Sequence, residues 1–485
     1  MARATNQWRR TTLDRVRAMF NKDAEQNYEP LSDASTIEED VHRPVLFMPD
    51  HRESQDSDTE QDKKDDGEPF SWFEYCIFLL LGIAMLWAWN MFLAAAPYFQ
   101  TRFRDNENIL AHFQSAIISV GCVTNLSSML ILAQLQSKAS YPKRILSSLG
   151  INIIVFSLLS VSTSYFRMVS STGYLVFTLI MVFSTSIATG LCQNGAFAFA
   201  SSFGRPEYIQ AIMTGQAVAG VLPSVAQILS VLAVPAPDRW ANATEEDAVM
   251  NHENTTSAFI YFLTATAISV ICLFAVIPLI RKHNRILESQ MMTSITSIEE
   301  AEQAKRKVVS MWTLYKKLHW LAASVFLCFT VTMFFPVFTQ KIVSVLPEDR
   351  APRLFRSAAF IPLGFLVWNL GDLMGRLVTL LPFSMRHRPV VLFILAILRI
   401  GFLPLYLLCN IQGRGAKINS DAFYLFVVQL GFGGTNGWLS SSCMMGAGEY
   451  IEDGEREAAG GFMAVNLVAG LTAGSLLSFA AAGVA

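Results

Sequence analysis

A carboxylate and a guanidinium lie close together inside one of the most apolar parts of the chain. Asp372 and Arg376 belong to the run from Trp368 to Arg376, within an apolar stretch from about residue 358 to 383. Each charge costs roughly 2.5 to 3.5 kcal/mol at the centre of a membrane helix. Their spacing of four places them on one helix face, and Asn369, three residues before Asp372, lies on that same face. The run therefore predicts a ladder of polar groups inside a membrane-spanning helix.

Other polar side chains occur inside apolar segments. Asn90 follows Trp89, Gln193 lies deep in a later segment, and Arg399 is a further cation near the C-terminal end. One interpretation of the ladder is a structural ion pair that holds helices together. Because these other groups also lie at membrane depth, a water-filled cavity for a polar, uncharged, hydrogen-bonding solute accounts for more of the buried polar side chains than an ion pair does.

Composition places the chain among polytopic membrane proteins, since 52% of its 485 residues are hydrophobic and 16% are charged. Residues 1–69 differ, with 10 Lys and Arg against 17 Asp and Glu and few large apolar residues. Such a segment cannot bury enough apolar surface to fold, so we predict a disordered cytosolic tail. Its run Tyr28-Glu29-Pro30-Leu31 fits a tyrosine-based sorting pattern and is a candidate contact for sorting adaptors.

Segments that are long and apolar enough to cross a bilayer as helices follow the tail. We expect an all-α polytopic membrane protein with eleven transmembrane helices. Its parts are a tail (1–69), a first helical bundle (70–280), a cytosolic linker loop (281–317) and a second bundle (318–485). The expected helices cover about 72–99, 110–136, 144–166, 172–203, 208–234, 257–280, 319–341, 358–383, 389–411, 422–446 and 457–484.

The distribution of basic residues orients these helices. Loops on the side of the tail carry 15 Lys and Arg, and loops on the opposite side carry 10, which predicts a cytosolic N-terminus. The loop between the fifth and sixth helices holds two glycosylation sequons, at Asn242 and Asn254, on the predicted non-cytosolic side. An odd number of helices places the C-terminus in a lumen or outside the cell.

Enzyme chemistry finds no support in the motifs. The chain has no H-E-x-x-H zinc motif, no G-x-S-x-G nucleophile elbow and no P-loop. An intramembrane aspartyl protease needs a second carboxylate beside the first, and Asp372 is the only carboxylate deep in an expected helix. We expect no enzyme, no cofactor, no metal and no nucleic-acid partner, which leaves a passive or ion-coupled carrier.

The motif Trp368-Asn369-x-x-Asp372-x-x-Gly375-Arg376 resembles the helix 8 signature of equilibrative nucleoside transporters. Further pieces similar to that family follow in the family's order over nearly all of residues 72–484: Trp89-Asn90, Gln193, Met213-Thr214-Gly215-Gln216, Phe335-Pro336, Asn436-Gly437 and Ala459-Gly460. The resemblance implies a six-plus-five, major-facilitator-like arrangement that works by alternating access. It also implies that Asp372 and Arg376 bind the ribose hydroxyls, while Gln193 and Trp89 meet the nucleobase.

Two residues depart from the family pattern: Ala88, where the family commonly has Pro, and Trp368, where it commonly has Phe. They bear on the substrate range. The long acidic tail is most similar to fungal, intracellular members, which favours a vacuolar or endosomal membrane over the plasma membrane. The candidate substrate-binding residues are Trp89, Asn90, Gln193, Asn369, Asp372 and Arg376.

We therefore expect a carrier that moves purine and pyrimidine nucleosides through the bilayer, with Asp372, Arg376, Trp89 and Gln193 facing a shared cavity. A proton-coupled symporter of nucleosides or related solutes, such as a nucleobase or nicotinamide riboside, is the alternative mechanism. A non-transporting membrane receptor or scaffold is the alternative from a different class.

Overall fold

The computed structural model describes residues 70–135, 140–166, 168–233, 243–291, 309–347, 350–381 and 385–482, which are helical almost throughout. All of them belong to one unit of the chain, Asp65–Ala485. The tail with its sorting pattern, Tyr28 to Leu31, lies outside the described residues, and so does Asn242.

The helices follow the expected spans closely. The first half of the chain forms α2 (Trp72–Ala94), α3 (Ala96–Arg102), α4 (Glu107–Gln134), α5 (Tyr141–Tyr165), α6 (Ser171–Ser202), α7 (Pro206–Ala233) and α8 (Ala243–Met291). The second half forms α10 (Met311–Thr332), α11 (Phe334–Thr339), η1 (Arg353–Phe355), α12 (Ser357–Val378), α13 (Pro389–Leu398), η2 (Arg399–Gly401), α14 (Phe402–Tyr406), η3 (Phe423–Leu430), α15 (Gly431–Gly446), η4 (Ala447–Tyr450), η5 (Asp453–Glu455) and α16 (Arg456–Ala482).

Ten of the described helical segments are long and apolar enough to cross a membrane. The remaining expected span, about 422–446, is a continuous run in which the π-helical η3 leads into α15. Each expected span thus corresponds to one helix or to one run of consecutive helices. Proline accounts for one of the interruptions, since α10 and α11 are separated at Met333, shortly before Pro336.

Hydrogen-bonding side chains set the starts of several helices. Ser71, Asn106, Ser170 and Ser310 each precede a helix and accept a hydrogen bond from a backbone N–H two or three residues later. Such caps satisfy N–H groups that have no partner within the helix. They fix where α2, α4, α6 and α10 begin.

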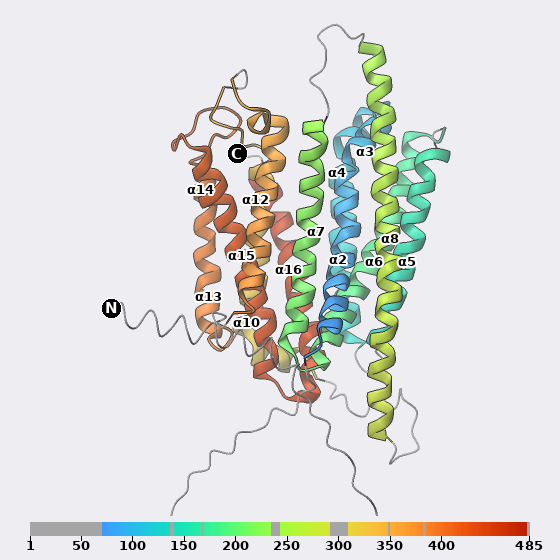
Figure 1. Cartoon of the computed structure of the whole chain (residues 1–485), viewed down its shortest axis with the longest axis vertical. Helices are drawn as coiled ribbons and strands as arrows, with labels where there is room; N and C mark the ends of the chain where they lie inside the picture. The colour runs from blue at the N-terminus through green and yellow to red at the C-terminus, as the bar shows by residue number, and fades with distance from the viewer. Residues whose placement is uncertain are drawn as a thin grey trace, which may run out of the picture. The chain divides into compact units, whose positions relative to one another are not determined.

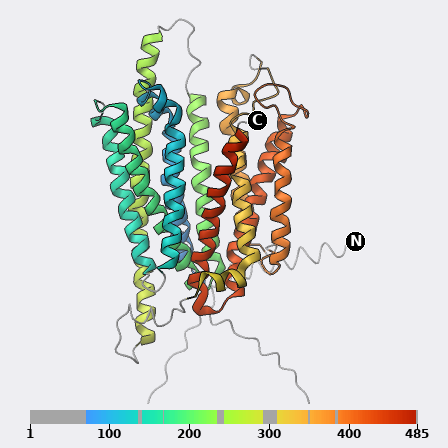
Figure 2. The same ribbon diagram turned by 180° about the vertical axis from the view of Figure 1, so that it is seen from behind.

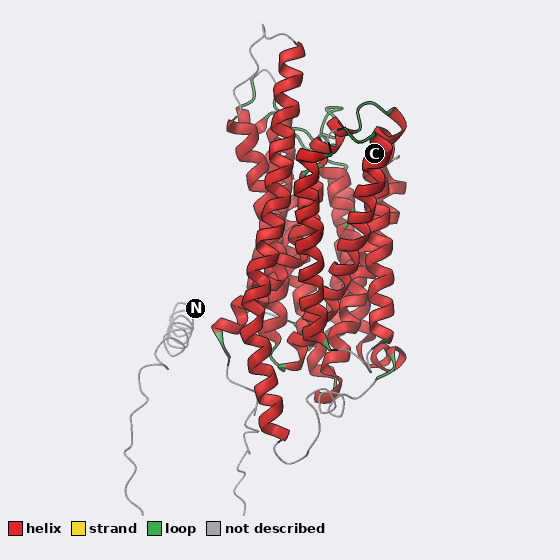
Figure 3. Ribbon diagram, turned by 90° about the vertical axis from the view of Figure 1, so that its right-hand side faces the viewer, coloured by secondary structure: helices red, strands yellow, loops and turns green. Residues whose placement is uncertain are grey.

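The segment 281–317 differs from its expected form as a loop. α8 continues through Met291, and α10 begins at Met311. Both extensions are anchored, because Lys282 of α8 pairs with buried Glu74 and Lys317 of α10 pairs with buried Glu455. α8 therefore extends beyond its neighbours at both ends of the bundle (Figures 1 and 3).

The helices gather into two groups that follow the two halves of the sequence. In Figure 1, α2, α4, α5, α6 and α8 lie on one side, and α10 and α12 to α15 lie on the other. α7 and α16 stand at the junction, where α7 packs on α12 and α16 packs on α4 and α6 (Figures 1 and 2). α2 begins at the lower end in Figure 1, and α16 ends near the upper end.

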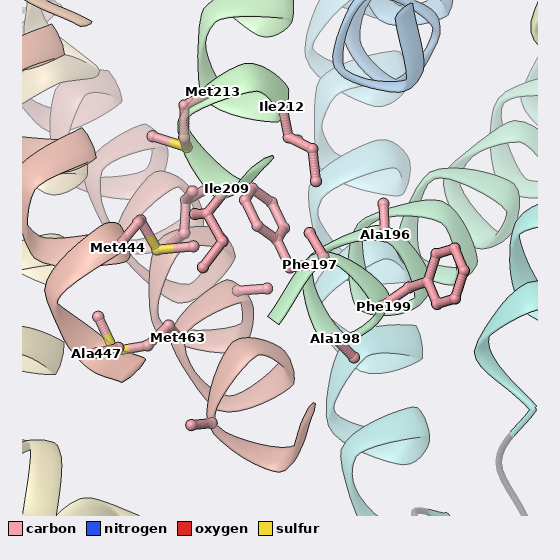
Figure 4. Packing of buried hydrophobic residues seen from close by; sticks show 14 of the residues in the cluster. Ala196, Phe197, Ala198, Phe199, Ile209, Ile212, Met213, Met444, Ala447 and Met463 are labelled. Atoms are coloured by element: carbon pink, nitrogen blue, oxygen red, sulfur yellow. The ribbon is translucent and has the colours of Figure 1, made fainter. Parts of the chain in front are cut away.

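The apolar core is divided unequally between the two ends. One cluster of buried residues, which we call the joint core, draws on both halves and includes Phe78, Phe197, Met213, Met444 and Met463. Figure 4 shows side chains of α7 and α6 facing those of α15 and α16 within it. Two further clusters each belong to a single half: Ala88 to Ala265 in the first, and Val331 to Phe432 in the second. Among the residues that the structure describes, the buried core that the halves share thus lies at the end where α2 begins.

Candidate functional site

Close packing of α12 on α15 holds the ladder in place. A Cβ added to Gly371 or Gly375 on α12 would overlap backbone atoms of η3 or α15, and one added to Gly433 or Gly437 on α15 would overlap backbone atoms of α12. Small residues permit this approach of two backbones within a membrane. This close contact fixes the position of Asp372 between Gly371 and Gly375.

Asp372 and Arg376 form a buried ion pair along one face of α12. Arg376 Nε donates to Asp372 Oδ2 at 2.8 Å, and the two residues are 5% and 3% exposed. The other carboxylate oxygen, Oδ1, accepts from Asn436 Nδ2 at 2.7 Å. Pairing and hydrogen bonding of this kind offset the desolvation of buried charges, whereas removing one partner costs about 3 to 5 kcal/mol.

The pair also joins the two halves of the chain. Arg376 Nη1 donates to the carbonyl oxygen of Met213 on α7 at 2.5 Å. Gln210, also on α7, donates through Nε2 to the carbonyl oxygen of Arg376 at 3.1 Å and accepts from Tyr75 on α2 at 2.7 Å. Met213 and Tyr75 belong to the joint core. The ion pair therefore lies at the edge of the region where the halves are packed together.

Two more of the predicted residues contact α7. Asn90 Nδ2 donates to the carbonyl oxygen of Ala219 at 2.7 Å. Asn369 Nδ2 donates to the carbonyl oxygen of Phe365 at 2.9 Å and to Ser224 Oγ at 3.3 Å. Both amides are only partly buried. α7 thus lies between the polar groups of α2 and those of α12.

Gln193 of α6 and Trp89 of α2 each contact α4. Asn125 Nδ2 donates to Gln193 Oε1 at 3.3 Å. The Trp89 ring lies against Gly121, which is one helical turn before Asn125. By their contacts the six predicted residues fall into two groups. Trp89 and Gln193 contact α4, whereas Asn90, Asn369 and Arg376 contact α7, and Asp372 pairs with Arg376.

Three polar residues outside the predicted set complete these groups: Asn436, Gln210 and Asn125. Asn436 is 1% exposed and Gln210 is fully buried. The side-chain oxygen Oδ1 of Asn125 is buried without a hydrogen-bond partner in the described structure. Each is an amide in an otherwise apolar helix, and that signal, which singled out Asn90 and Gln193, would have selected them as well.

Metal chemistry has no candidate centre within the described residues, where no three His, Cys, Asp and Glu side chains come together. All seven cysteines are free, and five of them are buried. A free, buried cysteine behaves as a small apolar residue.

Two groups of membrane helices with a paired charge at their junction define a polytopic membrane transporter, and solved structures show the same fold. The major facilitator superfamily transporter FucP in the outward conformation superposes with a TM-score of 0.53 at 13% identity, over 85% of this chain and 97% of that one. The proton:xylose symporter XylE gives a TM-score of 0.52 at 10% identity, over 84% of this chain and 86% of that one. These similarities establish a major-facilitator-like fold.

Sequence comparisons identify the family. The family model described as nucleoside transporter matches residues 179–482. The nucleoside transporter FUN26 of Saccharomyces cerevisiae is 30% identical over 453 residues, which cover 84% of this chain and 83% of that protein. Equilibrative nucleoside transporter 1 of Homo sapiens is 25% identical over 461 residues, covering 84% and 96%. The chain belongs to the nucleoside transporter family and is a transporter rather than an enzyme.

Proposed function

We propose that this protein moves purine and pyrimidine nucleosides across a membrane, down their concentration gradient, by alternating access. The observation that carries the proposal is the Asp372–Arg376 pair, which is buried at the junction of the two halves. A carrier of this type needs a polar site at the place where its two bundles meet.

The chemistry of the pair suits a ribose. A carboxylate oxygen can accept more than one hydrogen bond, and each oxygen of Asp372 accepts one from the described residues. Vicinal hydroxyl groups can donate to the remaining lone pairs, and the Arg376 guanidinium can donate to a ring or hydroxyl oxygen. Gln193 would read a base edge through its amide, and Trp89 would stack on the base.

The packing supports a specific order of events. The joint core closes the end where α2 begins, so a nucleoside would enter from the other end, where each half has its own core. Opening the closed end separates α7 from α12, which breaks the bonds from Arg376 to Met213 and from Gln210 to Arg376. Rocking of one half against the other would then expose the site to the opposite side.

The orientation and the membrane follow from sequence patterns. We propose a cytosolic tail (1–69), bundles at 70–280 and 318–485 joined by a cytosolic linker within 281–317, and a C-terminus in a lumen. A vacuolar or endosomal membrane is proposed, with the Tyr28–Leu31 run as a contact for sorting adaptors. Asn242 and Asn254 are candidate glycosylation sites, and Asn254 lies within α8.

A proton-coupled symporter remains the second candidate, because Asp372 is a buried carboxylate on the proposed route. Transport of [³H]uridine into proteoliposomes, with and without an imposed pH gradient, separates the two mechanisms. Facilitated transport predicts saturable uptake that stops at equal concentrations and ignores the gradient. Accumulation driven by the gradient would replace facilitated transport with symport.

Competition in the same assay tests the substrate class. Inosine, cytidine and adenosine should inhibit uridine uptake, whereas ribose and the free bases should not. Inhibition by free bases alone would point to a nucleobase carrier, and inhibition by nicotinamide riboside would widen the substrate range. Absence of saturable uptake by folded protein would favour a receptor or scaffold.

A further inference from the structure

A second buried cation lies behind the ion pair. Arg399, in η2, is 3% exposed, and it forms no ion pair with any carboxylate among the residues that the structure describes. Its guanidinium instead donates to neutral acceptors: the carbonyl oxygen of Cys328 at 2.9 Å, Cys328 Sγ at 2.8 Å, and the hydroxyls of Thr332 and Thr435 at 3.3 Å each. The ring of Phe432 lies 4.8 Å from it. A charge kept at this depth without a direct ion pair needs a reason beyond packing.

The hydrogen bonds lead from Arg399 to Asp372 in three steps. Arg399 Nη2 donates to Thr332 Oγ1, and the Thr332 hydroxyl donates to Asn436 Oδ1 at 2.6 Å. Asn436 Nδ2 then donates to Asp372 Oδ1 at 2.7 Å. The carbonyl oxygen of Cys328, which also lies within reach of the Thr332 hydroxyl, already accepts from Arg399. The shorter distance to Asn436 Oδ1, 2.6 Å against 2.8 Å to the Cys328 carbonyl oxygen, favours donation from Thr332 to Asn436.

We call this chain of hydrogen bonds, from Arg399 through Thr332 and Asn436 to Asp372, the relay. It fixes which way the Asn436 amide points. Its Oδ1 accepts from Thr332 and, at 3.3 Å, from Cys328 Sγ, so its NH₂ group must face the Asp372 carboxylate. A flipped amide would place its oxygen against the carboxylate and its NH₂ group against two donors. Hydrogen bonds to charged groups are stronger than neutral ones, so this arrangement holds Asp372 Oδ1 firmly.

We propose that Arg399 and Thr332 are positioning residues, which orient the Asn436 amide so that Asp372 Oδ1 is fixed to accept a sugar hydroxyl. This inference rests on the proposed nucleoside site and adds a layer behind it. Neither residue needs to touch the substrate. Their hydrogen bonds reach Asp372 through Asn436.

The Thr332→Val variant tests the relay, because valine keeps the shape and removes the hydroxyl. Thr330→Val is the matched control, since Thr330 lies on the same helix and bonds only the carbonyl oxygens of Phe326 and Gly470. The readout is the uridine concentration at half-maximal uptake by reconstituted protein of verified folding. We expect a rise of about five- to tenfold for Thr332→Val, which corresponds to one lost hydrogen bond, and less than twofold for Thr330→Val.

Coupling between the variants distinguishes positioning from general destabilisation. Asn436→Ala should raise the half-maximal concentration at least as much, and adding Thr332→Val to it should change nothing further, because Thr332 acts through Asn436. Arg399→Lys should retain part of the affinity that Arg399→Leu loses. Additive effects of Thr332→Val and Asn436→Ala, or a half-maximal concentration within twofold of wild type for Thr332→Val, would overturn the proposal.

Failure of the proposed function would look different. If the folded wild-type protein moved no nucleoside, the site assignment would fall. The relay would then be tested by thermal unfolding in detergent, with single and double variants Thr332→Val and Asp372→Asn. Non-additive melting temperatures would support the hydrogen-bonded chain, and additive ones would refute it.

Discussion

Replacing Gly437 by alanine is the sharpest probe of how the fold positions the carboxylate. The added Cβ would lie 2.8 Å from the carbonyl carbon of Asp372 and 3.0 Å from the backbone nitrogen of Arg376, and closer still to the Asp372 carbonyl oxygen. Both residues of the ion pair would have to move away with α12. Gly434→Ala, one turn earlier on α15, is the matched control, because its nearest neighbour is the Gly371 carbonyl oxygen at 3.7 Å, an ordinary contact.

Two opposing effects determine how much Gly437→Ala changes the free energy of unfolding. Overpacking costs about 1 to 3 kcal/mol, whereas alanine in place of glycine within a helix returns at most about 1 kcal/mol. We expect a melting temperature lower by roughly 2 to 6 °C for Gly437→Ala, and an unchanged or slightly higher one for Gly434→Ala. Displacement of Asp372 by a fraction of an ångström to about 1 Å should reduce uridine transport on the order of tenfold.

The assay is thermal unfolding in detergent, followed by uridine uptake into proteoliposomes at matched protein density. Reduced transport with a lowered melting temperature for Gly437→Ala, against normal behaviour of Gly434→Ala, would support the close packing. If both variants behaved like the wild type, the α12–α15 contact could not be what holds Asp372 in place.

Three further predictions address the closed end of the bundle. Ile209 and Met444 face each other across the two halves (Figure 4). Cysteines introduced at both positions, in a Cys76→Ser background, should be joined by a short bifunctional thiol reagent, and the link should block transport. Full transport by the linked protein would argue against rocking of the halves. Gln210→Leu, which removes the acceptor of the Tyr75 hydroxyl and one of the donors to the Arg376 carbonyl oxygen, should lower the unfolding free energy by about 1 to 3 kcal/mol, and a melting temperature equal to wild type would show that these bonds contribute nothing net. Glu74→Gln, which keeps an acceptor for Tyr208 but loses the charge opposite Lys282, should cost less than about 1 kcal/mol because Lys282 is 46% exposed, and salt titration of the wild-type melting temperature should show a similarly small effect.

The sequence predicts the parts of the site that depend on local geometry. The pairing of Asp372 with Arg376 follows from a spacing of four on one helix, and the close packing of α12 follows from glycines at the same spacing. Partners distant in the chain leave no such signal. Asn436 is 64 residues from Asp372, and the backbone acceptor of Arg376, Met213, is 163 residues away.

The hydropathy pattern also does not predict the helix ends that extend beyond the apolar segments. α8 reaches Met291 and α10 starts at Met311, although the residues between 281 and 317 are polar. Burial of Glu74 and Glu455 against lysines of these extensions supplies contacts that no apolar pattern records. Trp89 and Gln193 were expected to meet the nucleobase from the family resemblance, and their contacts with α4 in the structure could not be predicted from the sequence.

Direct binding measurements test most simply whether Asp372 binds the sugar of a nucleoside. Equilibrium binding of [³H]uridine to purified protein should be saturable in the wild type. The conservative Asp372→Asn variant should lose at least tenfold in affinity, because a charged acceptor becomes a weaker neutral one. Asp421→Asn is the control, since Asp421 bonds Ser344 and the backbone of Val345 away from the ion pair. Wild-type affinity in folded Asp372→Asn protein would show that the Asp372 carboxylate does not bind the sugar.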